Sequence, residues 1–181
     1  MAHKAQRKFC IRVKEQWPTH FLNTAVLDVG SLDINGNNRF LFENSSYLGI
    51  DIAAGTNVDQ VVLAHELDLT DQSFDTVIST ECFEHDMHYK ASLENIIRML
   101  KPGGLFLFTC ATTGRKEHGT RRTSPSDSPF TCEIEEGWGD YYKNLTETDI
   151  RDAISIESYF SECQFEDNRD LFDLYFWGIK K

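Results

Sequence analysis

The chain has 181 residues and a formal net charge of -11, a length typical of a single domain that buries about 70% of its unfolded surface. Five of its 18 basic residues lie in the first 20 positions, so the remainder is still more acidic. Such a surface repels phosphate backbones, which makes nucleic acid an unlikely partner. No apolar run reaches the roughly 18 residues of a membrane span, and none follows the basic N-terminus as in a signal peptide.

Five widely spaced cysteines, none of them in a C-x-x-C pair, argue against a disulfide framework and against a zinc site. We therefore expect reduced thiols and a cytoplasmic protein.

The first half of the chain alternates apolar runs with polar or glycine-containing turns. Phe9, Val13 and Trp17 fall at helical spacing, which predicts a helix within residues 1–22 that ends near Pro18. Further apolar runs predict strands at residues 25–29, 47–51, 58–63 and 73–79, with a short helix at 37–43.

The second half begins with a helical stripe over residues 88–100, which Pro102 and the two glycines after it bring to an end. Residues 105–110 are nearly all apolar, as in a central strand buried on both faces. Glycine, proline, serine and threonine then dominate residues 112–143, a segment that we expect to be a lid or acceptor loop. Thr146 is a predicted N-cap, and strands are expected at 160–165 and 171–179.

Strands that alternate with helices in this way predict an α/β fold with a doubly wound, mostly parallel seven-stranded sheet. The last strand is expected to be antiparallel, and residues 1–181 to form one domain. In such sheets ligands bind at the carboxyl ends of the strands.

Residues 26–30, Val-Leu-Asp-Val-Gly, read as a buried strand that breaks into a glycine turn. About twenty residues later a second strand ends on Asp51, whose carboxylate can accept both hydroxyls of a ribose. A dinucleotide site needs G-x-G-x-x-G to hold a pyrophosphate, whereas only Gly30 and Gly36 are present here. The turn therefore favours a cofactor without phosphate, and a nicotinamide-dependent oxidoreductase is the weaker interpretation.

Taken together, these motifs resemble the class I S-adenosylmethionine-dependent methyltransferases, with their Asp-Val-Gly first motif and Leu-Lys-Pro-Gly-Gly turn. The resemblance runs from about Val26 to Thr109 and implies a Rossmann-like methyltransferase fold. One departure is that Ser31 and Leu32 follow Gly30, where the family usually continues Gly-x-Gly.

The resemblance implies S-adenosylmethionine as cofactor and gives roles to particular residues. Asp28, Gly30 and Ser31 would shape the turn at the aminoacyl end, and Glu81 would face the cofactor's charged end. Asp51 would hold the ribose, Ile52 would flank the adenine, and His65 and Glu66 would lie at the adenine edge. For Asp51 a helix cap or surface acid, and for His65 a solvated loop histidine, are the alternatives.

Methyl transfer to a hydroxyl needs a general base, and His85 and His118 are the candidates. The run Glu81–His88 is rich in histidine and acids, but its spacing matches no ligand motif, so no metal is expected. The loop has basic residues that suit an anionic acceptor or else only a solvated loop, and an aromatic cluster that suits a sugar-containing acceptor or else only packs as an anchor. The basic residues are Arg115, Lys116, Arg121 and Arg122, and the aromatic ones are Trp138, Tyr141 and Tyr142.

The predicted function is methyl transfer to a small-molecule or sugar-containing acceptor, at oxygen or nitrogen. The alternative is a non-catalytic S-adenosylmethionine-binding partner or scaffold module, which the altered first motif favours.

Overall fold

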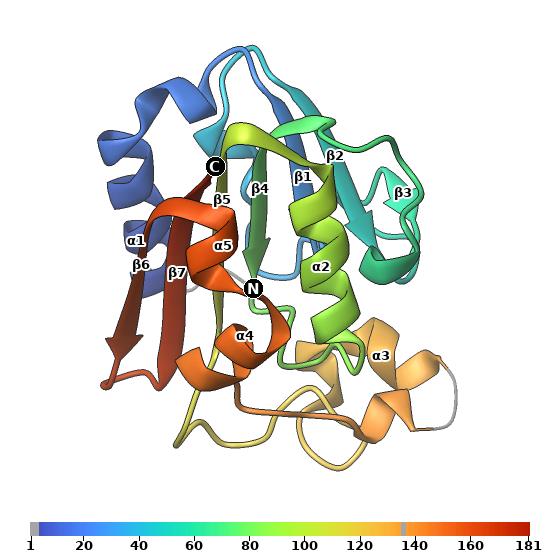
Figure 1. Cartoon of the computed structure of the whole chain (residues 1–181). Coiled ribbons are helices and arrows are strands. Elements are labelled where there is room, and N and C mark those ends of the chain that lie inside the picture. Colours follow the sequence, from blue (N-terminus) through green and yellow to red (C-terminus); the bar gives the residue numbers. More distant parts are fainter. Residues whose placement is uncertain (1–3, 135–136) are drawn as a thin grey trace.

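The computed structural model describes residues 4–134 and 137–181, and it is built on one seven-stranded sheet (Figure 1). The strands lie in the order β3-β2-β1-β4-β5-β7-β6. Strand β7 runs antiparallel to both its neighbours, whereas the pairings among β1 to β5 are parallel. The strands are β1 (Ala25–Val29), β2 (Ser46–Asp51), β3 (Gln60–Val61), β4 (Phe74–Thr80), β5 (Leu100–Ala111), β6 (Phe160–Asn168) and β7 (Asp173–Lys180). The predicted fold class is confirmed.

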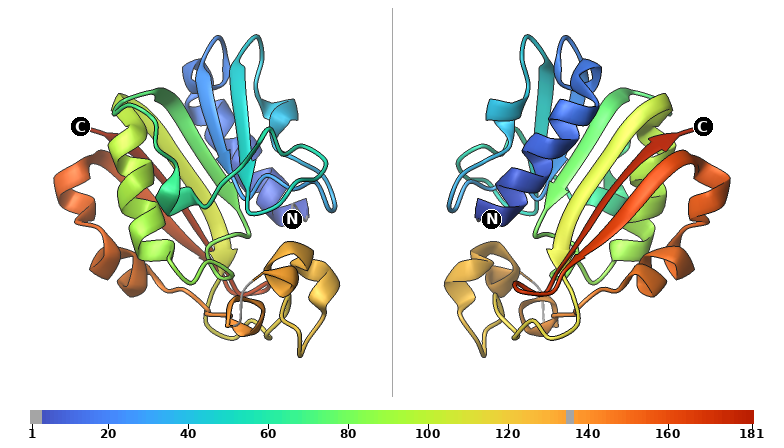
Figure 2. Two further views of the ribbon diagram at one scale, coloured as in Figure 1. Left: turned by 90° about the vertical axis from the view of Figure 1, so that its right-hand side faces the viewer. Right: turned by 90° about the vertical axis from the view of Figure 1, so that its left-hand side faces the viewer.

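Helices cover both faces of the sheet (Figure 2). On one face α1 buries Phe9, Cys10 and Val13 against apolar residues of the sheet. On the other face α2, α4 and α5 pack on a larger apolar cluster. Their bounds are α1 (Lys4–Gln16), α2 (Tyr89–Met99), α4 (Glu147–Ala153) and α5 (Ile156–Tyr159). No helix in the described part of the chain is both long and apolar enough to cross a membrane.

The connection between β1 and β2 departs most from the expected pattern. The helix predicted over residues 37–43 is a single 3-10 turn, Arg39–Leu41, because asparagine and glycine precede it and favour turns over helix. Side chains brace the connection instead: Asn57 donates to the Ser31 carbonyl at 2.7 Å, and Arg39 donates to Asn57 at 2.5 Å.

Other boundaries differ by a few residues. Helix α1 ends at Gln16, and Pro18–Phe21 forms a 3-10 turn, because a proline interrupts the α-helical hydrogen bonds. Strand β3 spans only Gln60–Val61 of the expected 58–63. Strand β5 begins at Leu100, and an irregularity in its pairing with β4 accommodates the proline and glycines that end α2.

Residues 112–143 are here called the lid segment, and their described parts, 112–134 and 137–143, lie below the carboxyl ends of the strands in Figures 1 and 2. The segment contains short helical turns rather than one long loop: Pro125–Asp127, α3 (Pro129–Glu133) and Trp138–Asp140. Hydrogen bonds of Arg121 to the carbonyls of Cys132 and Ile134 tie these turns together.

Candidate functional site

A cleft opens at the carboxyl ends of the central strands, between the sheet and the lid segment. It encloses about 720 Å³ of empty space, part of it open to solvent. Of the residues predicted for the site, the lining includes Gly30, Asp51, Ile52, His65, Glu81 and His85.

The glycine turn after β1 forms one wall of this cleft. Gly30 has a φ of +76°, and a Cβ built on it would lie 2.6 Å from both Cβ and Sγ of Cys82. The amides of Gly30 and Ser31 both donate to the Ile50 carbonyl at 3.0 Å. Because both amides already donate to Ile50, the turn contributes a close-fitting backbone surface to a ligand site rather than free N–H groups.

Asp51 ends β2 at the next wall, and its carboxylate is held in place by two backbone amides. Leu32 N donates to Oδ2 at 3.0 Å, and Ile52 N donates to Oδ1 at 2.8 Å. Burial raises the pKa of Asp51 above its ordinary value, although both amide donors oppose that shift. The position is fixed before any ligand arrives, and each oxygen keeps a lone pair for a further donor.

Asp28 and Ser31 lie behind the turn and not on the cleft lining. Asp28 is buried, accepts a 2.5 Å hydrogen bond from the Tyr47 hydroxyl, and is contacted by Asn38 at 3.3 Å. The Ser31 hydroxyl donates to the Asn57 carbonyl at 3.1 Å. Both residues can therefore act on a ligand only by holding the turn in shape.

His65 and Glu66 belong to a 3-10 turn, Ala64–Glu66, which Asn95 of α2 holds through a 2.8 Å bond to the Ala64 carbonyl. The His65 ring lies on the cleft, with its centroid 4.4 Å from that of His88. Glu66 is not among the lining residues; its side chain is 62% exposed, with Oε1 3.9 Å from His65 Nε2. Of this pair, His65 lines the cleft.

Glu81 follows β4 with a φ of +52°, a conformation uncommon for residues other than glycine. Thr109 donates to its Oε1 at 3.1 Å. Burial and the nearby carboxyl groups of Glu84 and Asp173 raise the pKa of Glu81 above its usual range. A cation bound beside it would favour the carboxylate form again.

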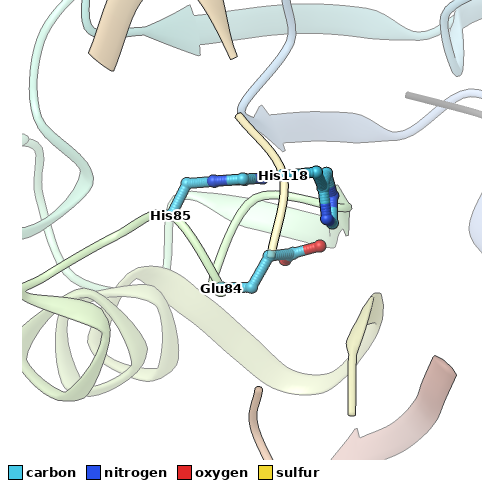
Figure 3. A group of neighbouring side chains, drawn as sticks. All are labelled: Glu84, His85 and His118. Atoms are coloured by element: carbon cyan, nitrogen blue, oxygen red, sulfur yellow. The ribbon is translucent and has the colours of Figure 1, made fainter. Parts of the chain in front are cut away.

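His85 and His118 meet at the edge of the cleft, with ring centroids 5.1 Å apart and planes at 89°. The Tyr142 ring contacts both, at 5.5 Å and 5.0 Å. Glu84 lies beside them (Figure 3). Burial lowers the pKa of His85 to about 3 and that of His118 below its usual value, so both imidazoles are neutral at pH 7.

The lid segment contributes more of the lining than the sequence indicated. Asp127, Phe130 and Trp138 face the cleft, as do Cys82 and Asp86 after β4. Phe130 is an apolar residue in a polar segment, which was the signal available for it. Three basic side chains of the segment form ion pairs within the protein. Arg115 contacts buried Asp173 of β7 at 3.3 Å, and Arg121 and Arg122 both pair with Asp140 of the same segment.

Comparison with known proteins agrees with this geometry. Residues 27–108 match a family model described as a methyltransferase domain. A search among curated proteins finds no match. The fold and residues 27–108 are thus similar to those of class I S-adenosylmethionine-dependent methyltransferases, a family whose cofactor is S-adenosylmethionine.

Solved structures share the fold at low sequence identity. Burkholderia thailandensis 1,6-didemethyltoxoflavin-N1-methyltransferase superposes with a TM-score of 0.66 at 15% identity, over 98% of this chain and 79% of that one. Haemonchus contortus phosphoethanolamine N-methyltransferase 2 gives 0.63 at 15%, over 96% and 52%. The CurJ carbon methyltransferase gives 0.62 at 15%, over 96% and 52%. The chain thus spans about half the length of the last two.

Proposed function

We propose that this chain transfers the methyl group of S-adenosylmethionine to an oxygen or nitrogen atom of a small-molecule or sugar-containing acceptor. The observation that carries the proposal is a cleft in which Asp51 and the Gly30 turn face side chains of the lid segment. Support also comes from two structural neighbours, whose structures contain 1,6-didemethyltoxoflavin and phosphomonomethylethanolamine as bound small molecules.

We assign cofactor roles to the predicted residues according to where they lie in the cleft. Asp51 accepts the ribose hydroxyls, Ile52 packs on the adenine and His65 lies at its edge. Glu81 faces the positively charged end. Asp28 and Ser31 hold the turn from behind, and we assign Glu66 no direct contact, since its side chain is exposed.

Methyl transfer is an in-line displacement, in which the sulfonium loses its charge as the acceptor forms a bond to the methyl carbon. Most of the acceleration comes from holding the two reactants in line and away from water. The lid segment supplies that enclosure, through Phe130 and Trp138 on the cleft lining. If the acceptor is a hydroxyl, His118 or His85 takes its proton.

The proposal is tested first at the cofactor. Asp51→Asn should weaken S-adenosylmethionine binding by roughly 2 to 3 kcal/mol in calorimetry, because a charge-assisted acceptor for the ribose is lost. Asp68→Asn removes the same charge from an exposed position of the following segment and should leave binding unchanged. Equal affinities of wild type and Asp51→Asn would remove Asp51 from the site.

Catalysis is tested with a mixed acceptor pool, by measuring formation of S-adenosylhomocysteine. Wild type should convert the cofactor, and His118→Ala should lower turnover about 100-fold while cofactor affinity stays intact. Cofactor binding without turnover in any pool would support the scaffold alternative, which the Ser31-Leu32 departure from the family's turn favours.

A further inference from the structure

Three side chains with metal-ligating atoms meet beneath the lid segment: Glu84, His85 and His118 (Figure 3). Glu84 is fully buried and His85 is 6% exposed. Among the residues that the structure describes, neither Glu84 Oε2 nor His85 Nδ1 has a hydrogen-bond partner, and the buried hydroxyl of adjacent Tyr142 also lacks one. Because buried polar atoms are nearly always satisfied, such a group of orphaned atoms calls for a water or an ion.

The remaining atoms of these groups are already oriented. Ala111 N donates to Glu84 Oε1 at 3.1 Å, which leaves Oε2 as the free oxygen. His118 Nδ1 lies 3.1 Å from the Lys116 carbonyl, so that the proton resides on Nδ1 and Nε2 is left as the basic nitrogen. A backbone carbonyl or amide that fixes the far atom of a ligand is the usual outer support of a protein metal site.

We propose that Glu84, His85 and His118 form a binding site for one divalent transition-metal ion, of which Zn²⁺ is the representative. Two imidazoles and one carboxylate suit Zn²⁺ or Fe²⁺, whereas Mg²⁺ and Ca²⁺ prefer oxygen ligands alone. Spacing along the sequence did not reveal this set, because His118 comes from the lid segment and the other two residues follow β4.

The ligand atoms lie within 4.8 Å of one another. Ligands of a tetrahedral ion with bonds of about 2.1 Å are about 3.4 Å apart, so the three groups must close by an ångström or so. Glu84 and His85 are anchored to the sheet, and His118 moves with the lid segment. Binding of the ion therefore fastens this segment to the floor of the cleft.

Three protein ligands leave a fourth position for water or for another ligand, as in catalytic rather than structural sites. His85 also lines the cleft, so this position lies at the cleft wall. A bound ion would replace His118 in making an acceptor oxygen reactive, since coordination lowers the pKa of that oxygen and its proton can pass to water in the open part of the cleft.

The site is tested with Zn²⁺ and Co²⁺ on the full chain, freed of metal by a chelator and without S-adenosylmethionine. Calorimetry should show one Zn²⁺ per chain, and Co²⁺ should give visible absorption bands of a four- or five-coordinate ion. Glu84→Gln, which can keep the bond from Ala111 N, and His118→Ala should each weaken binding at least tenfold. His20→Ala, in the 3-10 turn Pro18–Phe21 at the amino-terminal end of the central strands, should bind as wild type does.

Absence of stoichiometric binding, or equal binding by wild type, Glu84→Gln and His118→Ala, would overturn the proposal. S-adenosylmethionine affinity is measured separately on the same metal-free samples. Failure of cofactor binding with metal binding intact would count against the proposed function and not against this site.

Discussion

Gly30 shows how one residue shapes the cofactor cleft. Its φ of +76° lies in the left-handed region, and Cys82 occupies the space of a side chain. Gly103 has nearly the same φ, +74°, and no atom of the described residues lies within 4 Å of a Cβ built there. A substitution at Gly103 therefore introduces backbone strain alone, whereas the same substitution at Gly30 introduces backbone strain and a steric clash with Cys82.

Gly30→Ala should abolish S-adenosylmethionine binding, because the new Cβ must displace Cys82 and with it the cleft wall. Gly103→Ala should cost only the backbone strain, about 1 to 2 kcal/mol of unfolding free energy, and leave binding intact. Calorimetry measures the affinities and thermal unfolding the stabilities. Wild-type binding by Gly30→Ala would place the cofactor elsewhere.

Gly30 and Asp51, the cleft residues that belong to sequence motifs, could be predicted from the sequence. Each comes at the end of a strand, and the strand determines where the residue lies and which residues surround it. The direction of Asp28 follows from strand alternation: Val26 packs on the α1 side and Leu27 on the other, so Asp28 shares the α1 side with Val26. The exposed direction of Glu66 depends on the 3-10 turn that carries it, and no periodicity encodes such a turn.

At the scale of elements, strands were easier to predict than the connections between them. The apolar runs predicted β1 to within its bounds, and the capping box at Thr146 and Asp149 begins α4 as expected. In the β1–β2 connection, hydrogen bonds among polar side chains stand in place of the predicted helix. One of these bonds joins Arg39 to Asn57, two residues that are distant in the sequence. The sequence shows that both residues are present, but it does not show that they contact each other in the folded chain.

Close contacts between the lid segment and the body of the protein flank the cleft. Phe130 approaches the β2–β3 connection so closely that a Cβ on Gly55 would lie 2.8 Å from its ring. Gly119 in the same way makes room for the His85 ring, 2.6 Å from a built Cβ. These contacts flank the cleft, so a ligand that fills the cleft adds contacts to the lid segment.

Trypsin should therefore cut after Arg115, Arg121 or Arg122 quickly in the free protein and more slowly with S-adenosylhomocysteine, since lid closure over a ligand excludes the protease. Fragments are identified by mass spectrometry over a time course. Cleavage after Lys14, in the last turn of α1, serves as the internal control. Equal cleavage of the lid segment with and without ligand would make it a passive connection.

For the whole molecule, buried acids lie on both sides of the sheet. On the α2 side Asp86, beside an apolar cluster, accepts a hydrogen bond from Ser92 of α2 at 2.5 Å. The α1 side contains, besides its apolar cluster, the carboxyl group of Asp28, which is 1% exposed. A buried acid of this kind makes the stability of the entire fold depend on pH.

Burial raises the pKa of Asp28 to about 6 from 3.8, although Tyr47 and Asn38 donate to it; Asp51 adds to the rise. Since the folded state holds this proton more tightly than the unfolded state, the stability that it contributes is full below pH 3.8 and is lost as pH rises through about 6. Two pKa units correspond to about 3 kcal/mol.

Asp28→Asn keeps a neutral group of the same shape and has no proton to lose. Its unfolding free energy, measured by urea titration, should gain about 2 kcal/mol relative to wild type between pH 4 and pH 6.5. Asp68→Asn, which removes an exposed acid, should follow the wild-type curve in parallel. If instead wild type gained on Asp28→Asn as pH rose, the hydrogen bond from Tyr47 would outweigh burial, and Asp28 would be a stabilising anion beneath the cofactor turn.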